Sequence, residues 1–208
     1  SRSYTIPTSL LSQKTRYRFS ICAVMTDGVQ RWSDERYFYI SSHNGINTTP
    51  LTLVSWSGFT YDTKIGVYYA CQAWDSAIGT EVVNTPPTTT VHNDNTINNN
   101  DGNNRVTGVS QGLNGNLATT YYRYYTSNKK VIEADININK SYPWVNSSMS
   151  GYYDVQNVIT HEVGHVVGLC DIYDSWATEI TMYGSASTGE IKKRTLETHD
   201  TVSANHLY

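Results

Sequence analysis

Alternation of large and polar side chains predicts strands in two parts of the chain. Near the start, residues 17–24 alternate before a turn at residues 26–28, and residues 37–40 resume the pattern. A turn between two such runs is typical of a hairpin. Farther along, residues 51–56 and 131–138 also show strand patterning, and we expect a strand at each.

Two further segments carry apolar residues at the three- and four-residue steps of a helix. The first runs from residue 67 to residue 78. In the second, the apolar positions are Val155, Val158, Ile159, Val163 and Val166. Asp154 is placed to cap this second helix and Gly168 to end it, which predicts a helix over residues 154–167.

Between these helices, residues 84–116 are dominated by Asn, Thr, Gly and Pro. A segment of this composition has little apolar surface to bury. We therefore expect a long excursion over the surface of the protein.

The charge balance changes sign near residue 43, which predicts a domain boundary. Residues 1–42 hold six Lys and Arg against three Asp and Glu, whereas the remainder holds nine against fifteen. Residues 43–50 are mostly small and polar, so we expect a linker, followed by a second domain over residues 51–208.

The β-rich segment 1–42, from Tyr4-Thr5-Ile6-Pro7 through Trp32-Ser33-Asp34-Glu35, resembles the last three strands of a fibronectin type III sandwich. Half a sandwich exposes its inner face, so we expect a truncated domain rather than a hairpin packed on its neighbour.

Composition excludes several classes of function. Charged residues make up 16% of the chain and the net charge is -3, so nucleic acid is not an expected partner. No apolar run approaches the roughly 18 residues that span a bilayer. Three cysteines are too few for a disulfide framework, and Cys71 and Cys170 could equally pair or stay free. The hydroxyl-rich composition is common in exported proteins, so we expect a secreted, extracellular protein. We also expect a monomer.

The second helix carries the residues with the clearest chemistry. His161 and His165 are four residues apart, so both imidazoles lie on one face and can reach a single ion. Glu162, beside them, can contact a zinc-bound water without binding the metal, which suits a general base. Gly168 allows a left-handed turn that folds the chain back. We therefore expect Asp171 to meet the same ion as the third ligand.

The run His161-Glu162-Val163-Gly164-His165-Val166-Val167-Gly168-Leu169-Cys170-Asp171 resembles the metzincin zinc-peptidase motif, and Met182 resembles its Met-turn. Within the metzincins, residues 51–208 are most similar to the matrixins, with residues 114–119 resembling the substrate-aligning edge strand. The resemblance implies an α+β fold with a twisted, mostly parallel sheet, an active-site helix and a C-terminal helix. It also implies a catalytic Zn²⁺, protein or peptide substrates and endopeptidase activity. Whether the protein also binds Ca²⁺ is left open.

Three features depart from the matrixin pattern. Asp171 stands where matrixins usually place His and is similar to the third ligand of snapalysin-like proteases. His199-Asp200 replaces an acidic pair in the closing helix. The pattern of the structural zinc and calcium loops is not clearly present.

Two alternatives remain from the sequence. A gluzincin-type peptidase would take its third ligand from a later helix, with Glu190 or Glu197 as candidates. A zinc-containing adhesion or binding module would use the metal for structure alone, but such a module has no need of Glu162.

Overall fold

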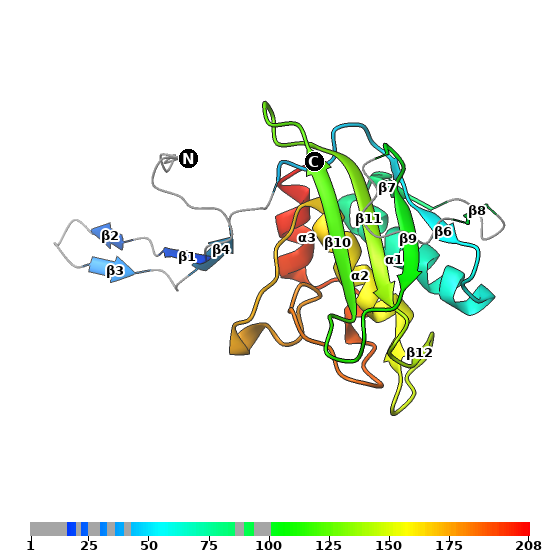
Figure 1. Cartoon of the computed structure of the whole chain (residues 1–208). Helices are drawn as coiled ribbons and strands as arrows, with labels where there is room; N and C mark the ends of the chain where they lie inside the picture. Colours follow the sequence, from blue (N-terminus) through cyan, green and yellow to red (C-terminus); the bar gives the residue numbers. More distant parts are fainter. Residues whose placement is uncertain are drawn as a thin grey trace. The chain divides into compact units, whose positions relative to one another are not determined.

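A computed structural model describes residues 43–85, 90–93 and 101–208 in full, together with the backbones of four strands within residues 1–42. The chain divides into two compact units, Ser1–Ser42 and His43–Tyr208. Their elements can be followed in Figure 1. Each unit is described by itself.

The first unit contains two antiparallel pairs of short strands. β1 (Arg16–Phe19) pairs with β4 (Arg36–Tyr39), and β2 (Cys22–Val24) pairs with β3 (Gln30–Trp32). The strand expected over residues 17–24 is thus divided into β1 and β2. The turn predicted at residues 26–28, and the side chains on which the fibronectin type III resemblance depends, lie outside the described residues.

The second unit is built on a five-stranded sheet with the order β10-β11-β9-β6-β8. These strands are β6 (Val54–Trp56), β8 (Val91–His92), β9 (Arg105–Val109), β10 (Ala118–Tyr124) and β11 (Val131–Asn139). All pairings are parallel except that between β10 and β11, which leaves β10 as an antiparallel edge. Two smaller parallel pairs join β5 (Leu51–Thr52) to β7 (Val83–Asn84) and β12 (Trp144–Val145) to β13 (Tyr153–Asp154).

Three α-helices accompany the sheet: α1 (Tyr61–Ile78), α2 (Val155–Val167) and α3 (Thr198–Asn205). Two short 3₁₀ segments are η2 (Ser175–Ala177) and η3 (Lys192–Arg194). Helices α1 and α2 pack against each other on one face of the sheet (Figure 1). The mostly parallel sheet and the two expected helices confirm the predicted α+β fold.

The core lies between the sheet and these two helices. Trp74 of α1 is fully buried, and its indole N–H donates to the carbonyl of Thr160 in α2 at 2.7 Å. Every residue of α2 except Gln156 and His165 is buried. A helix buried on nearly all sides is fixed in position by its packing, so side chains that project from α2 are held rigidly.

The local signals at the ends of α2 act as predicted. Asp154 caps the helix, because its Oδ1 accepts the N–H of Asn157 at 2.7 Å. Its carboxylate also pairs with Arg194. The helix ends at Gly168, whose N–H donates to the carbonyl of Gly164 at 3.0 Å. Helix α1 begins at Tyr61 rather than at residue 67, because Thr60 caps it.

Residues 43–50 do not form a linker. His43 is fully buried and Ile46 is 3% exposed, and the segment bonds to the start of β11, where the N–H of Asn47 donates to the carbonyl of Val131 at 2.8 Å. Small polar residues are typical of linkers, but the burial of these two side chains makes the segment part of the second unit.

The surface excursion expected over residues 84–116 is also wrong in part. It contains β9, an inner strand of the sheet, whose residues Val106–Val109 are buried. A parallel strand covered on both faces has no alternation. β9 is also short and lies among Asn and Gly residues, so the composition of the segment does not indicate a strand.

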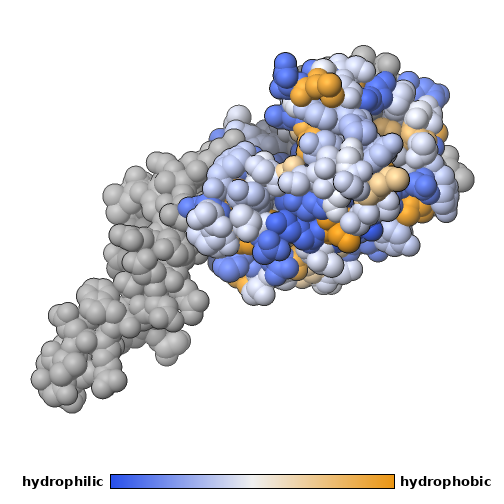
Figure 2. Space-filling model, turned by 90° about the horizontal axis from the view of Figure 1, so that it is seen from below, coloured by the Kyte–Doolittle hydropathy of each residue, from blue (hydrophilic) through white to orange (hydrophobic). Residues whose placement is uncertain are grey.

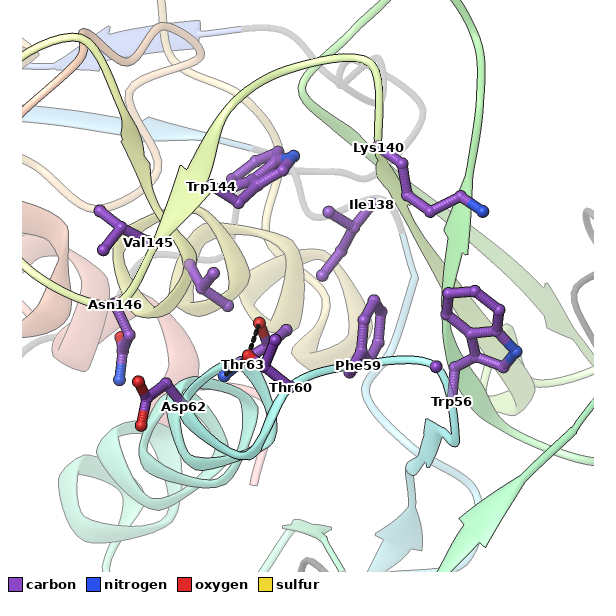
Figure 3. A pocket seen from close by; sticks show the side chains of 12 residues that line it. Trp56, Phe59, Thr60, Asp62, Thr63, Ile138, Lys140, Trp144, Val145 and Asn146 are labelled. Atoms are coloured by element: carbon purple, nitrogen blue, oxygen red, sulfur yellow. Dashed lines mark hydrogen bonds between the residues drawn. The ribbon is translucent and has the colours of Figure 1, made fainter.

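A cavity of about 400 Å³ lies where β6, the start of α1 and the end of β11 meet. Trp56, Phe59 and Trp144 line it (Figure 3), and the Lys140 ammonium lies 4.6 Å from the centre of the Trp56 ring. On the face of the second unit shown in Figure 2, hydrophobic residues form small separate groups among polar ones. Among the described residues, no helix has the length and apolar character needed to cross a membrane.

Candidate metal centre

His161 and His165 project from one face of α2, with their ring centres 4.8 Å apart. Nδ1 of His161 lies 2.8 Å from the carbonyl oxygen of Thr181, and Nδ1 of His165 lies 2.8 Å from that of Leu169. A carbonyl oxygen can only accept, so each Nδ1 carries a proton. When the ring is neutral, its other nitrogen, Nε2, keeps its lone pair for a metal ion.

Asp171 faces the Nε2 atoms of both rings. Its Oδ1 lies 3.0 Å from Nε2 of His161 and 3.4 Å from Nε2 of His165. Ligand atoms bound to zinc tetrahedrally at about 2.0–2.2 Å are about 3.3 Å apart, so these spacings fit one zinc coordination sphere. Within residues 43–85, 90–93 and 101–208, these three side chains form the one group of three His, Cys, Asp or Glu residues that could hold a metal ion.

The charges of the cluster also suit a cation. Burial acts to lower the pKa of His165, but the hydrogen bond that the protonated ring donates to Asp171 and the charges of Glu162 and Asp171 outweigh it and raise that pKa. Burial acts to raise the pKa of Asp171, yet its contacts with the two histidines hold that pKa well below its usual range. Asp171 is therefore an anion that faces two imidazoles.

The turn at Gly168 brings Asp171 to this place. The φ angle of Gly168 is 130°, a conformation that side chains disfavour. A Cβ atom there would also lie 2.6 Å from Cδ1 of Leu207. The backbone conformation therefore favours glycine, as the sequence predicts, and a side chain at this position would be strained.

Two side chains from distant parts of the chain satisfy carbonyl groups at the end of α2. His43 donates through Nε2 to the carbonyl of His165 at 2.9 Å, and the Tyr208 hydroxyl donates to that of Val167 at 3.1 Å. The same hydroxyl accepts the N–H of Ile46 at 3.0 Å. Carbonyls in the last turn of a helix have no partner within it, so these contacts hold the end of α2 beside the turn.

Glu162 lies beside the histidines and is 6% exposed. Its Oε2 accepts a hydrogen bond of 2.6 Å from the hydroxyl of Thr120 in β10. The carboxylate is therefore held by a residue of β10, a strand distant from Glu162 in the chain.

Met182 packs beneath α2. A Cβ atom at Gly164 would lie 2.2 Å from the Met182 sulfur, so the absence of a side chain there makes room for the methionine. The backbone around it is fixed by Ile172, whose N–H donates to the Met182 carbonyl at 2.8 Å. Asp200 accepts the N–H of Thr181 at 3.0 Å and that of Met182 at 3.3 Å.

The residues that the gluzincin alternative requires are occupied elsewhere. Glu190 accepts a hydrogen bond from the side chain of Asn157 at 3.2 Å. Glu197 is the N-cap of α3, in a capping box with Asp200. Neither belongs to the group that could hold a metal ion.

Sequence reasoning missed four residues that support the centre: His43, Thr120, Lys193 and Tyr208. The buried Lys193 ammonium donates to the carbonyls of Tyr183 and Ser185, directly after Met182. These contacts join segments far apart in the chain, and no local pattern marks them.

Two imidazoles one helical turn apart, a neighbouring carboxylate and a third ligand-type residue after a glycine turn are typical of zinc-dependent metallopeptidases. The family model named Matrixin matches residues 60–208. The match covers well over half of the 208 residues, so the chain belongs to the matrixin family, whose members are metallopeptidases that typically bind zinc. A comparison with curated proteins finds no match.

Proposed function

We propose that the protein is a zinc endopeptidase in which His161, His165 and Asp171 hold the metal ion and Glu162 is the general base. Membership of the matrixin family supports the class of activity. The observation that carries the ligand assignment is the pair of carbonyl contacts at Nδ1 of the two histidines. They leave both Nε2 atoms facing Oδ1 of Asp171.

Each side chain has a separate part in peptide hydrolysis. Zinc bound there would supply a Lewis acid that polarises the peptide carbonyl and makes water acidic near neutral pH. Glu162 takes a proton from the attacking water and passes it to the leaving amine nitrogen. Asp171 and the histidines keep fixed positions, because Gly168 and the backbone carbonyls orient them.

Protein substrates outside the cell fit this family and the hydroxyl-rich composition, and we propose that the protein is secreted and acts as a monomer. Residues 51–208 are proposed as the catalytic domain, with the buried residues 43–50 as part of the same unit. Residues 1–42 are proposed as a β-rich segment that resembles a fibronectin type III domain.

The proposal is tested by cleavage of a denatured protein with and without a zinc chelator. We expect cleavage that the chelator abolishes and added zinc restores. The Glu162→Gln variant keeps the shape of the side chain but loses the base, so its kcat should fall by at least about 100-fold while its zinc content stays unchanged. Cleavage that ignores the chelator, or a fully active Glu162→Gln variant with bound zinc, would refute the assignment.

A further inference from the structure

The hydroxyl of Thr120 makes a short contact with the candidate base. Its Oγ1 lies 2.6 Å from Oε2 of Glu162 and 3.1 Å from the backbone carbonyl of the same residue. A hydroxyl has one proton to donate. A distance of about 2.5–2.7 Å is typical of a hydroxyl bonded to a carboxylate, so the proton is directed to Oε2.

The position of Thr120 in the sheet explains this contact. Thr120 lies opposite Ile136 of β11, which is fully buried. Cross-strand neighbours share one face of a sheet, and α2 packs against β10 and β11. The side chain of Thr120 is therefore on the face that carries the active-site helix, and the rigid sheet determines where the hydroxyl lies.

We propose that Thr120 is a positioning residue for Glu162, an inference that rests on the proposed function of Glu162 as the base. The hydroxyl holds Oε2 in place and leaves Oε1 to take the proton from water. Without it, the carboxylate can rotate, and fewer of its orientations are productive for proton transfer. The loss of activity should appear in kcat, the rate of the chemical step. The described hydrogen bonds of the Thr120 hydroxyl go to Glu162 and not to the candidate metal ligands.

Two substitutions separate the hydroxyl from the shape of the side chain. Thr120→Val keeps the volume and removes the donor, whereas Thr120→Ser keeps the donor. We expect Thr120→Val to lower kcat by about 10–100-fold, the usual cost of losing such a supporting contact, with KM changed by less than about twofold and zinc content unchanged. Thr120→Ser should retain most of the activity. Thr120→Ala, which also lacks the donor, should behave like Thr120→Val and serves if the valine variant does not fold.

Thr107 provides a matched control. It is a buried threonine of β9 that lies opposite Asn137, the residue next to Ile136, and so belongs to the other face of the sheet. Thr107→Val should leave kcat unchanged. If Thr120→Val and Thr120→Ala keep the wild-type kcat while the chelator abolishes activity in all variants, the role of Thr120 is refuted and the proposed function stands. If the wild type itself shows no chelator-sensitive cleavage, both proposals fail.

Discussion

Lys193 is a buried cation close to the candidate centre. It is 2% exposed, and it donates to the carbonyls of Tyr183 and Ser185. Burial lowers the pKa of its ammonium to about 8, against a smaller opposing effect of the Glu190 charge. A neutral amine can still donate to both carbonyls. Loss of the proton therefore removes the cost of a buried charge and keeps the contacts with Tyr183 and Ser185.

This lowered pKa predicts how stability depends on pH. Between about pH 8 and the ordinary lysine value of about 10.4, the unfolded chain binds a proton that the folded chain does not, so the free energy of unfolding should rise with pH. Below about pH 8 the full cost of the buried charge is present. Urea unfolding from pH 7 to pH 10 measures this. The rise should be smaller in Lys193→Met, and parallel profiles for the two proteins would contradict the prediction.

Helix α2 depends on partners beyond its own sequence. Its start is capped locally by Asp154, but carbonyls in its last turn are satisfied by His43 and Tyr208. These partners lie 122 residues before His165 and 41 residues after Val167. The end of the helix, from which Gly168 turns toward Asp171, is thus fixed by contacts distant in the chain.

We expect the loss of either contact to affect both stability and metal binding. Tyr208→Phe and His43→Ala leave a carbonyl without its donor, which costs about 1–3 kcal/mol where the group stays buried. Urea unfolding measures this cost, and chelator competition should show weaker zinc binding because the turn before Asp171 is less well fixed. Tyr61→Phe is the control, because Tyr61 is 67% exposed. Variants as stable as this control would rule out a role for the contacts.

The elements that could be predicted from the sequence are those with local signals. Helix α2 has regular apolar spacing, a capping aspartate and a glycine at its end, so its limits and the positions of His161 and His165 on one face follow directly. β9 was missed because a short strand covered on both faces has no alternation. The start of α1 was placed too late because Thr60, rather than apolar spacing, sets it.

At the scale of the whole molecule, the centre combines local and distant residues. Asp171 could be proposed from its spacing after Gly168, since the turn connects it directly to the helix. Thr120 and Asp200 could not, because each reaches its partner only after the sheet and α3 have packed around α2. The same is true of His43, whose polar neighbours indicated a linker until its burial placed it within the second unit.

The central claim is that Asp171, rather than a distant glutamate, completes the zinc site. The most direct test is the zinc content per chain of purified Asp171→Ala after dialysis against metal-free buffer, with Glu190→Gln and Glu197→Gln beside it. Circular dichroism would verify that each variant is folded. We predict one zinc ion per chain in the wild type and both glutamine variants, and little zinc in folded Asp171→Ala. Full zinc retention by Asp171→Ala, with loss of zinc from either glutamine variant, would contradict the account.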